Sequence, residues 1–123
     1  APGVETRLPL IFSGGVVGGR ISLNRFVQLT ATGPAKLFGL FPTKGTIAVG
    51  SDADLVLFDA GETWTIRAPE HHSRADYSLF EGREITGRIK KVFLRGRMIV
   101  DGETWLGRKG GGEIIRRGAS GAM

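Results

Sequence analysis

The chain has 123 residues, of which 41% are hydrophobic and 24% are charged, and it carries a formal net charge of +5. That length allows one small domain, and the ordinary apolar content does not predict disorder. The sequence contains no cysteine, which excludes a disulfide framework, a thiolate metal site and a cysteine nucleophile.

No apolar run has the length needed to cross a membrane, so we expect a soluble protein with no membrane partner. The absence of cysteine allows a reducing compartment, and we expect the cytoplasm. The chain begins at Ala1, without a methionine and without a visible targeting segment. We therefore expect either a processed chain or a piece of a longer protein.

The first forty residues predict helices. Residues 1–19 are expected to be helical or irregular, interrupted at Pro9 and ended by the pairs Gly14-Gly15 and Gly18-Gly19. Ser22 can cap a second helix, whose apolar stripe consists of Leu23, Phe26, Val27 and Thr30. Pro34 suits the first turn of a separate short helix over residues 35–38, which Gly39 would end.

The most informative run spans residues 44–59. Gly50 to Asp52 predict a turn, because glycine accepts a positive φ and Ser and Asp side chains can bind nearby backbone N–H groups. Leu55 to Phe58 predict a strand buried on both faces. Asp52 and Asp54 resemble a pair of metal ligands, but a divalent metal needs several converging ligands, so we expect them to cap the turn. The predicted structural joint consists of Lys44, Gly45, Gly50, Asp52 and Asp54.

After Gly45 the sequence predicts mostly strands. They are expected at residues 46–49, 55–58, 63–66, 89–94, 97–100 and 103–106, with turns at Arg95-Gly96 and Asp101-Gly102. Residues 69–82 predict a loop, and residues from Gly107 onward predict an extended, basic, glycine-rich tail. Helices followed by strands indicate an α+β fold, or the end of one domain joined to another.

No residue of the sequence is a predicted catalytic, substrate-binding or metal-binding residue. The only histidines, His71 and His72, are adjacent, and adjacent side chains diverge, so we expect them to pack or to form hydrogen bonds in a loop. Ser13 and Ser22 lack the Gly-x-Ser-x-Gly elbow of a serine nucleophile. The glycine-rich residues 14–19 lack the Gly-Lys-Ser/Thr of a phosphate loop.

The net positive charge makes nucleic acid a partner to consider. Basic residues gather at Lys90-Lys91 with Arg95 and Arg97, and again in the tail, but Phe93 is the only aromatic residue within the first cluster. Single-strand recognition combines basic residues with several aromatic platforms. We therefore expect solvated faces and a basic tail, and no nucleic-acid partner.

The motifs around the joint resemble those of the cyclic amidohydrolases. The segments that carry this resemblance are residues 2–9 (PGVETRLP), 19–27 (GRISLNRFV), 34–40 (PAKLFGL) and the joint itself. The loop over residues 71–77 (HHSRADY), followed by Phe80-Glu81-Gly82, is similar to the dihydropyrimidinase and D-hydantoinase branch of that family.

This resemblance implies that the chain is the C-terminal segment of a hydrolase that opens the ring of a dihydropyrimidine or a hydantoin. In that family a (β/α)8 barrel carries two divalent metals, usually zinc, and a smaller β-sandwich accompanies the barrel. Residues 1–43 would then be the last helical part of the barrel, residues 44–106 the C-terminal strands of the sandwich, and residues 107–123 a tail that crosses to another subunit.

The family's metal ligands all precede the matching segment, so the resemblance implies an inactive segment with no metal or cofactor of its own. Its partners would be the remainder of its polypeptide and further copies, since relatives are commonly tetramers. The alternative is a free-standing basic β-rich binding or assembly module, for which nucleic-acid affinity would fall steeply with salt.

Overall fold

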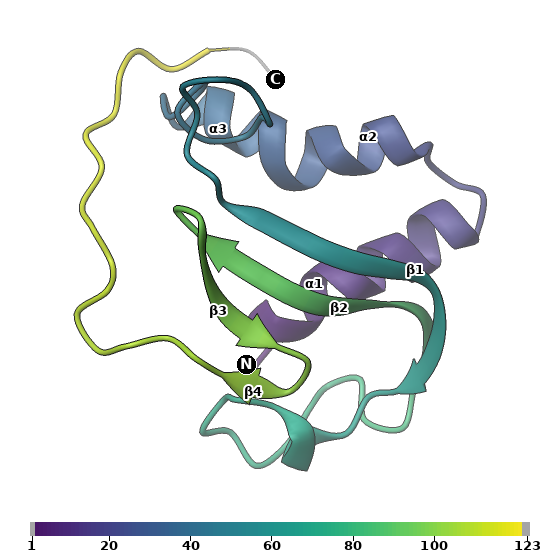
Figure 1. The fold of residues 1–123 in the computed structure, drawn as a ribbon. Helices are drawn as coiled ribbons and strands as arrows, with labels where there is room; N and C mark the ends of the chain where they lie inside the picture. Colours follow the sequence, from purple (N-terminus) through teal and green to yellow (C-terminus); the bar gives the residue numbers. More distant parts are fainter. Residues whose placement is uncertain (1, 122–123) are drawn as a thin grey trace. The chain divides into compact units, whose positions relative to one another are not determined.

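The computed structural model describes residues 2–121. Two helical runs precede a four-stranded sheet, which makes the fold α+β, as the order of the predicted elements indicates (Figure 1). The chain divides into two compact units. One unit comprises the chain up to Ser22 together with Phe58–Ile89, and the other comprises Leu23–Leu57 and the chain from Lys90 onward.

The first helical run belongs to the first unit. It begins as α1 (Val4–Ile11) and continues without a break as the π-helix η1 (Phe12–Val17). Pro9 lies inside α1, and Gly14-Gly15 lie inside η1, so the predicted interruption and the first predicted end are wrong. The helix ends at the Gly18-Gly19 pair as predicted, because Gly19 takes a φ of 73° that side chains disfavour.

The core of the first unit forms around this run. Phe12 is 5% exposed, and its ring meets the ring of Phe58 edge-on with the centroids 4.7 Å apart. Ile66 is fully buried and Ile85 is 3% exposed. The 3-10 turn η3 (Ala68–Glu70) opens the loop predicted over residues 69–82.

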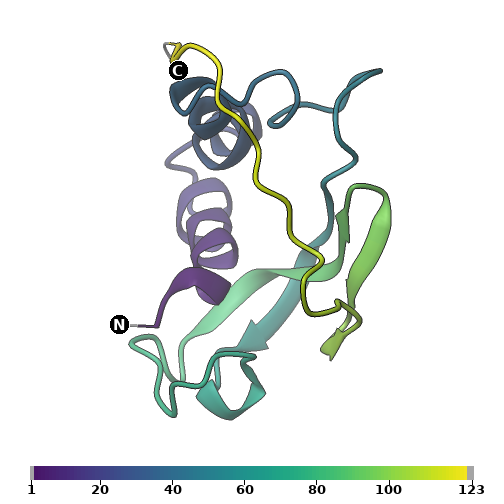
Figure 2. The same ribbon diagram turned by 90° about the vertical axis from the view of Figure 1, so that its left-hand side faces the viewer.

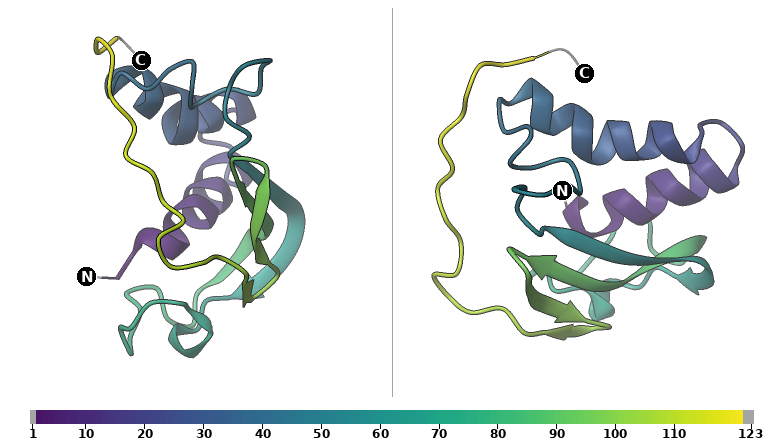
Figure 3. Two further views of the ribbon diagram at one scale, coloured as in Figure 1. Left: turned by 60° about the vertical axis from the view of Figure 1, so that its left-hand side comes forward. Right: turned by 45° about the horizontal axis from the view of Figure 1, so that its top comes forward.

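The second helical run belongs to the second unit. It comprises α2 (Leu23–Val27), the π-helix η2 (Gln28–Thr32) and α3 (Gly33–Leu37) in one continuous rod, seen clearly in Figure 3. Pro34 lies in the first turn of α3 and Gly39 follows its end with a φ of 70°, both as predicted, but α3 continues from η2 without a break. The wider π turns directly precede Pro34, where a proline ring would clash with the carbonyl four residues earlier in a regular α-helix.

The sheet has the strand order β1-β2-β3-β4. Its strands are β1 (Leu55–Thr65), β2 (Glu84–Leu94), β3 (Arg97–Asp101) and β4 (Thr104–Trp105). The last three form antiparallel pairs, with the two predicted turns between them. At the first turn Arg95 and Gly96 both take positive φ, 47° and 81°, as a tight hairpin turn demands.

Three strand predictions need correction. The strands expected at 55–58 and 63–66 are one strand, β1, which Gly61 does not interrupt. Residues 46–49 form no strand: they are irregular up to Ala48, where the bond from Ser51 N–H to Ala48 O closes a turn. The run from Leu55 is not buried on both faces, because Val56 and Leu57 are 45% and 51% exposed.

The tail has no regular secondary structure from Gly107 to Gly121, as predicted, and Ala122 and Met123 lie outside the described residues. Figure 2 shows it running in yellow from the β3–β4 hairpin to the end of α3. There Gly118 N–H donates to Gly39 O at 2.7 Å, and Gly121 N–H donates to Lys36 O at 2.8 Å. The tail thus adds hydrogen bonds at the C-terminal end of α3, to Lys36 O, which also accepts the Gly39 N–H, and to Gly39 O just beyond the helix.

Candidate functional site

The predicted joint residues meet around one amine. Lys44 Nζ lies 2.9 Å from a carboxylate oxygen of Asp52 and also donates a hydrogen bond to Asp54. The Lys44 side chain is only 15% exposed, and the two acids are 30% and 32% exposed. Asp52 and Asp54 are therefore ion-pair partners of Lys44, and the expectation that they only cap the turn is corrected. The turn is held instead by Ser51, whose hydroxyl donates to Pro42 O at 2.7 Å.

The two joint glycines take conformations that side chains disfavour. Gly45 has a φ of 86° and Gly50 has a φ of 90°. A Cβ atom on Gly45 would also lie 2.5 Å from the Cβ atom of Ala35 in α3. The Gly45 carbonyl accepts the Thr32 hydroxyl at 2.7 Å, which ties the joint to the helical run.

Charge pairing shifts two pKa values at this joint. Partial burial disfavours the charged form of Lys44, but its hydrogen bonds and charge attraction to Asp54 and Asp52 outweigh that effect and raise its pKa. Partial burial also disfavours the Asp54 carboxylate. Hydrogen bonds from Lys44 and from the Arg95 backbone outweigh this and lower the pKa of Asp54.

The joint also holds the β2–β3 turn. Asp54 Oδ1 accepts the Arg95 N–H at 2.9 Å, and Gly96 N–H donates to Ala53 O at 2.9 Å. These contacts span about forty residues of sequence, and no local pattern signals them. Sequence reasoning therefore found the acids but missed both of their partners, the Lys44 amine and the Arg95 amide.

The two histidines lie beside the start of α1. His72 binds Glu5 twice, through its backbone N–H and through Nδ1, both at 2.9 Å. This confirms the predicted hydrogen bonding in a loop, although Glu5 was not foreseen as the partner. Both histidines line a pocket of about 310 Å³ with residues 2–6, and His71 Nε2 is buried without a hydrogen-bond partner among residues 2–121.

The residues present do not fit the two divalent metals that the resemblance implies. Within residues 2–121, no three or more His, Cys, Asp or Glu side chains group closely enough to hold an ion. The acids at the joint bind Lys44, and His72 binds Glu5. We therefore assign no metal and no catalytic step to the described residues. Among them, no helix combines the length and apolar character required to cross a membrane.

Comparison with known proteins places the chain in a family. Residues 6–99 match the model of the amidohydrolase family. The chain is 48% identical to the D-hydantoinase of Geobacillus stearothermophilus over 122 residues, which are 99% of this chain and 26% of that protein. The chain belongs to the amidohydrolase family.

Solved structures of amidohydrolases agree with this assignment. The dihydropyrimidinase of Brevibacillus agri superposes with a TM-score of 0.94 at 46% identity, over 100% of this chain and 26% of that one. The D-hydantoinase of a Bacillus species gives a TM-score of 0.95 at 47% identity, over 98% of this chain and 26% of that one. The chain thus spans about a quarter of the length of the relatives it matches.

Proposed function

We propose that this chain is the C-terminal structural and assembly segment of a metal-dependent cyclic amidohydrolase, which opens the ring of a hydantoin or a dihydropyrimidine. The observation that carries the proposal is the 48% identity to a D-hydantoinase across 99% of this chain and only 26% of that relative. A match that covers nearly the whole chain but only a quarter of the relative favours a segment of an amidohydrolase over a free-standing nucleic-acid-binding module.

In this proposal each part of the chain has a structural role. Residues 1–43 form the last helical part of a (β/α)8 barrel, residues 44–106 form the C-terminal strands of a β-sandwich, and residues 107–123 form a tail at subunit contacts. The contacts of Asp54 support a structural role for the joint within the second unit, because its carboxylate pairs with Lys44 and also accepts the Arg95 N–H of the β2–β3 turn.

Exposed apolar side chains support the proposal that a further part of the polypeptide packs against this chain. Leu23, Val27 and Phe38 are 56%, 46% and 53% exposed, and they come from one helical run and the residue that follows it. Burying such side chains stabilises a protein by about 1.5–3 kcal/mol each. In the proposal the remainder of the polypeptide covers them and supplies the metal ligands, and the assembled enzyme is a homo-oligomer.

The test compares two purified samples. One is the 123-residue chain, and the other is the same chain joined to the preceding three quarters of a hydantoinase such as that of Geobacillus stearothermophilus. With zinc added, only the joined protein should hydrolyse 5-phenylhydantoin or dihydrouracil. Hydrolysis is measured as the loss of the ultraviolet absorbance of the intact ring. Hydrolysis by the 123-residue chain would overturn the proposal, and so would an inactive joined protein that folds and assembles normally.

A further inference from the structure

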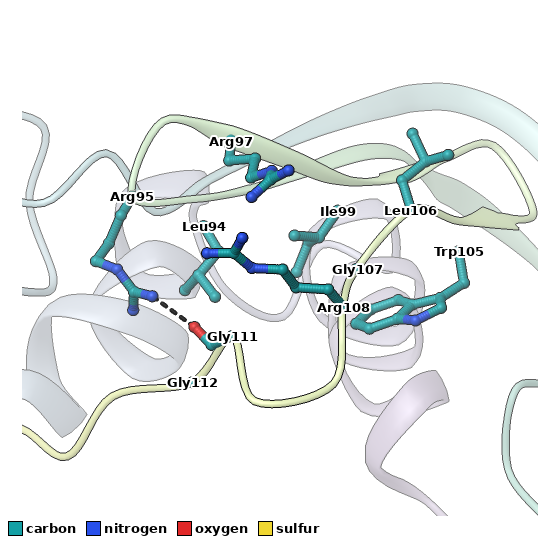
Figure 4. A pocket seen from close by; sticks show the side chains of 10 residues that line it. All are labelled: Leu94, Arg95, Arg97, Ile99, Trp105, Leu106, Gly107, Arg108, Gly111 and Gly112. Carbon is teal, nitrogen blue, oxygen red and sulfur yellow. Dashed lines mark hydrogen bonds between the residues drawn. The ribbon is translucent and has the colours of Figure 1, made fainter.

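A second pocket, distinct from the one at the histidines, lies in the second unit. It has a volume of about 300 Å³. Its apolar lining consists of Leu94 in β2, Ile99 in β3 and Leu106, the residue after β4. The indole of Trp105 lies at one end of the pocket (Figure 4). Pockets that bind small molecules begin at about this size and are mostly apolar with a few polar groups.

The first residues of the tail build the opposite wall. The Arg95 guanidinium donates to Gly111 O at 2.6 Å, and Gly111 N–H donates to Arg108 O at 3.2 Å, so the tail turns back toward the sheet. The Trp105 ring lies against Gly107, where a Cβ atom would lie 2.0 Å from that ring. The pocket is therefore shaped by specific contacts of the tail rather than by an open strand face.

Two positive charges at this pocket are unpaired. Arg95 is paired, because its guanidinium lies 3.6 Å from Glu113. Arg97 and Arg108 both line the pocket, and in Figure 4 the Arg108 side chain extends across it toward Leu94 while the Arg97 guanidinium lies above, beside its strand. Neither guanidinium has a hydrogen-bond or ion-pair partner among residues 2–121. A planar guanidinium binds a carboxylate through two parallel hydrogen bonds.

We propose that this pocket binds a small aromatic carboxylate. Its carboxylate lies between Arg97 and Arg108, and its ring packs against Trp105 and the apolar lining. An indole beside an apolar floor favours a flat ring, and two unpaired guanidinium groups favour an anion over a neutral molecule. The proposal does not depend on the activity of the parent enzyme, so either can fail without the other.

Phenylacetate is the probe, and the test uses the native polypeptide that contains these 123 residues. Equilibrium dialysis with radiolabelled phenylacetate measures saturable binding at constant salt. The double variant Arg97→Gln with Arg108→Gln should weaken one saturable site at least tenfold. The matched control is Arg116→Gln with Arg117→Gln, which removes the same charge from exposed tail positions and should change binding less than twofold. Sites elsewhere in the polypeptide remain in both variants and cancel in the comparison.

Neutral phenylacetamide tests the role of the anion. It should compete for this site at least tenfold more weakly than unlabelled phenylacetate. Equal binding by the two double variants, or equal competition by the amide, would overturn the proposal. If the first double variant unfolds, Arg108→Gln alone provides the test, because Arg108 is exposed in the tail. It should weaken binding at least threefold, and unchanged binding would contradict the proposal.

Discussion

Single residues at the joint show how a short motif can carry a structural function. Asp52 and Asp54 have the spacing that suggests metal ligands, but both carboxylates converge on the Lys44 amine. The same Asp54 carboxylate accepts the Arg95 N–H. One acid therefore stabilises two backbone segments that are distant in sequence, and its loss should destabilise both.

Replacing Asp54 with Asn should reduce the free energy of unfolding by about 1 kcal/mol at neutral pH, because the pair is partly exposed and so only partly shielded from solvent. The pKa of Asp54 is lowered from an ordinary value of 3.8, so its contribution is present above that value and is lost as the pH falls below it. The pKa of Lys44 is raised from 10.5, so its contribution is present below that value and is lost as the pH rises above it.

Urea unfolding from pH 2 to pH 12 measures both limbs of this dependence. Asp54→Asn should flatten the acid limb relative to the unchanged chain. The control is Asp76→Asn, which makes the same charge change at an exposed loop position and should leave the acid limb intact. An acid limb equally steep in both variants would contradict the assigned role of Asp54.

At the scale of elements, local signals determined the ends of helices and hairpins better than their interiors. The Gly18-Gly19 stop and the Arg95-Gly96 turn follow from positive φ, a property of the residue itself. Pro34 lies in the first turn of α3 as predicted, but the π turns that join α3 to the helix before it have no local signal. The full length of the strands was also not predicted. β2 begins at Glu84, before the predicted start at residue 89, and it pairs with β1, which is distant in sequence. The Asp54 and Glu5 partners escaped for the same reason.

Gly87 lets the strand β2 approach the helix run in the first unit. Its φ is 110°, and a Cβ atom there would lie 2.5 Å from Phe12 and 2.8 Å from Phe58. Gly87→Ala should therefore reduce the free energy of unfolding by about 2–4 kcal/mol, through backbone strain and overpacking together. Thermal and urea unfolding measure the change.

Gly61 in β1 is the matched control for Gly87. A Cβ atom on Gly61 meets nothing closer than 3.7 Å, and the backbone there has no positive φ. Gly61→Ala should therefore change the free energy of unfolding by no more than about 0.5 kcal/mol. Similar losses from both substitutions would mean that close packing at Phe12 is not what requires Gly87.

Across the whole molecule, the apolar core is unevenly divided. The buried hydrophobic residues of the first unit are Phe12, Ile66, Ala68 and Ile85, whereas those of the second unit are Phe26 and Ala35. Most of the exposed large apolar side chains belong to the second unit. In the isolated chain the second unit should therefore be the less stable one.

Hydrogen exchange can resolve that difference. In the isolated chain, the Ile66 amide, bonded to Arg83 O at 3.0 Å, should exchange at least tenfold more slowly than the Phe38 amide, bonded to Pro34 O at 2.9 Å. Rates are compared after correction for the intrinsic exchange of each sequence. Equal protection of the two amides would contradict an uneven stability.

Exposure of the α2 face should also cause the isolated chain to self-associate. Val27 is 46% exposed on α2, four residues after Leu23, which is 56% exposed, so the two side chains share one face of the helix. Val27→Glu should lower the apparent mass in light scattering, because a carboxylate is costly to bury in an apolar contact. Ile114→Glu is the control, since Ile114 is 100% exposed in the tail and carries the same change of charge away from that helix. A lower mass in both variants would point to a general effect of charge, whereas a lower mass only in Val27→Glu would assign the association to the α2 face. An unmodified chain that stays monomeric at every concentration would contradict the expectation that this face requires a partner.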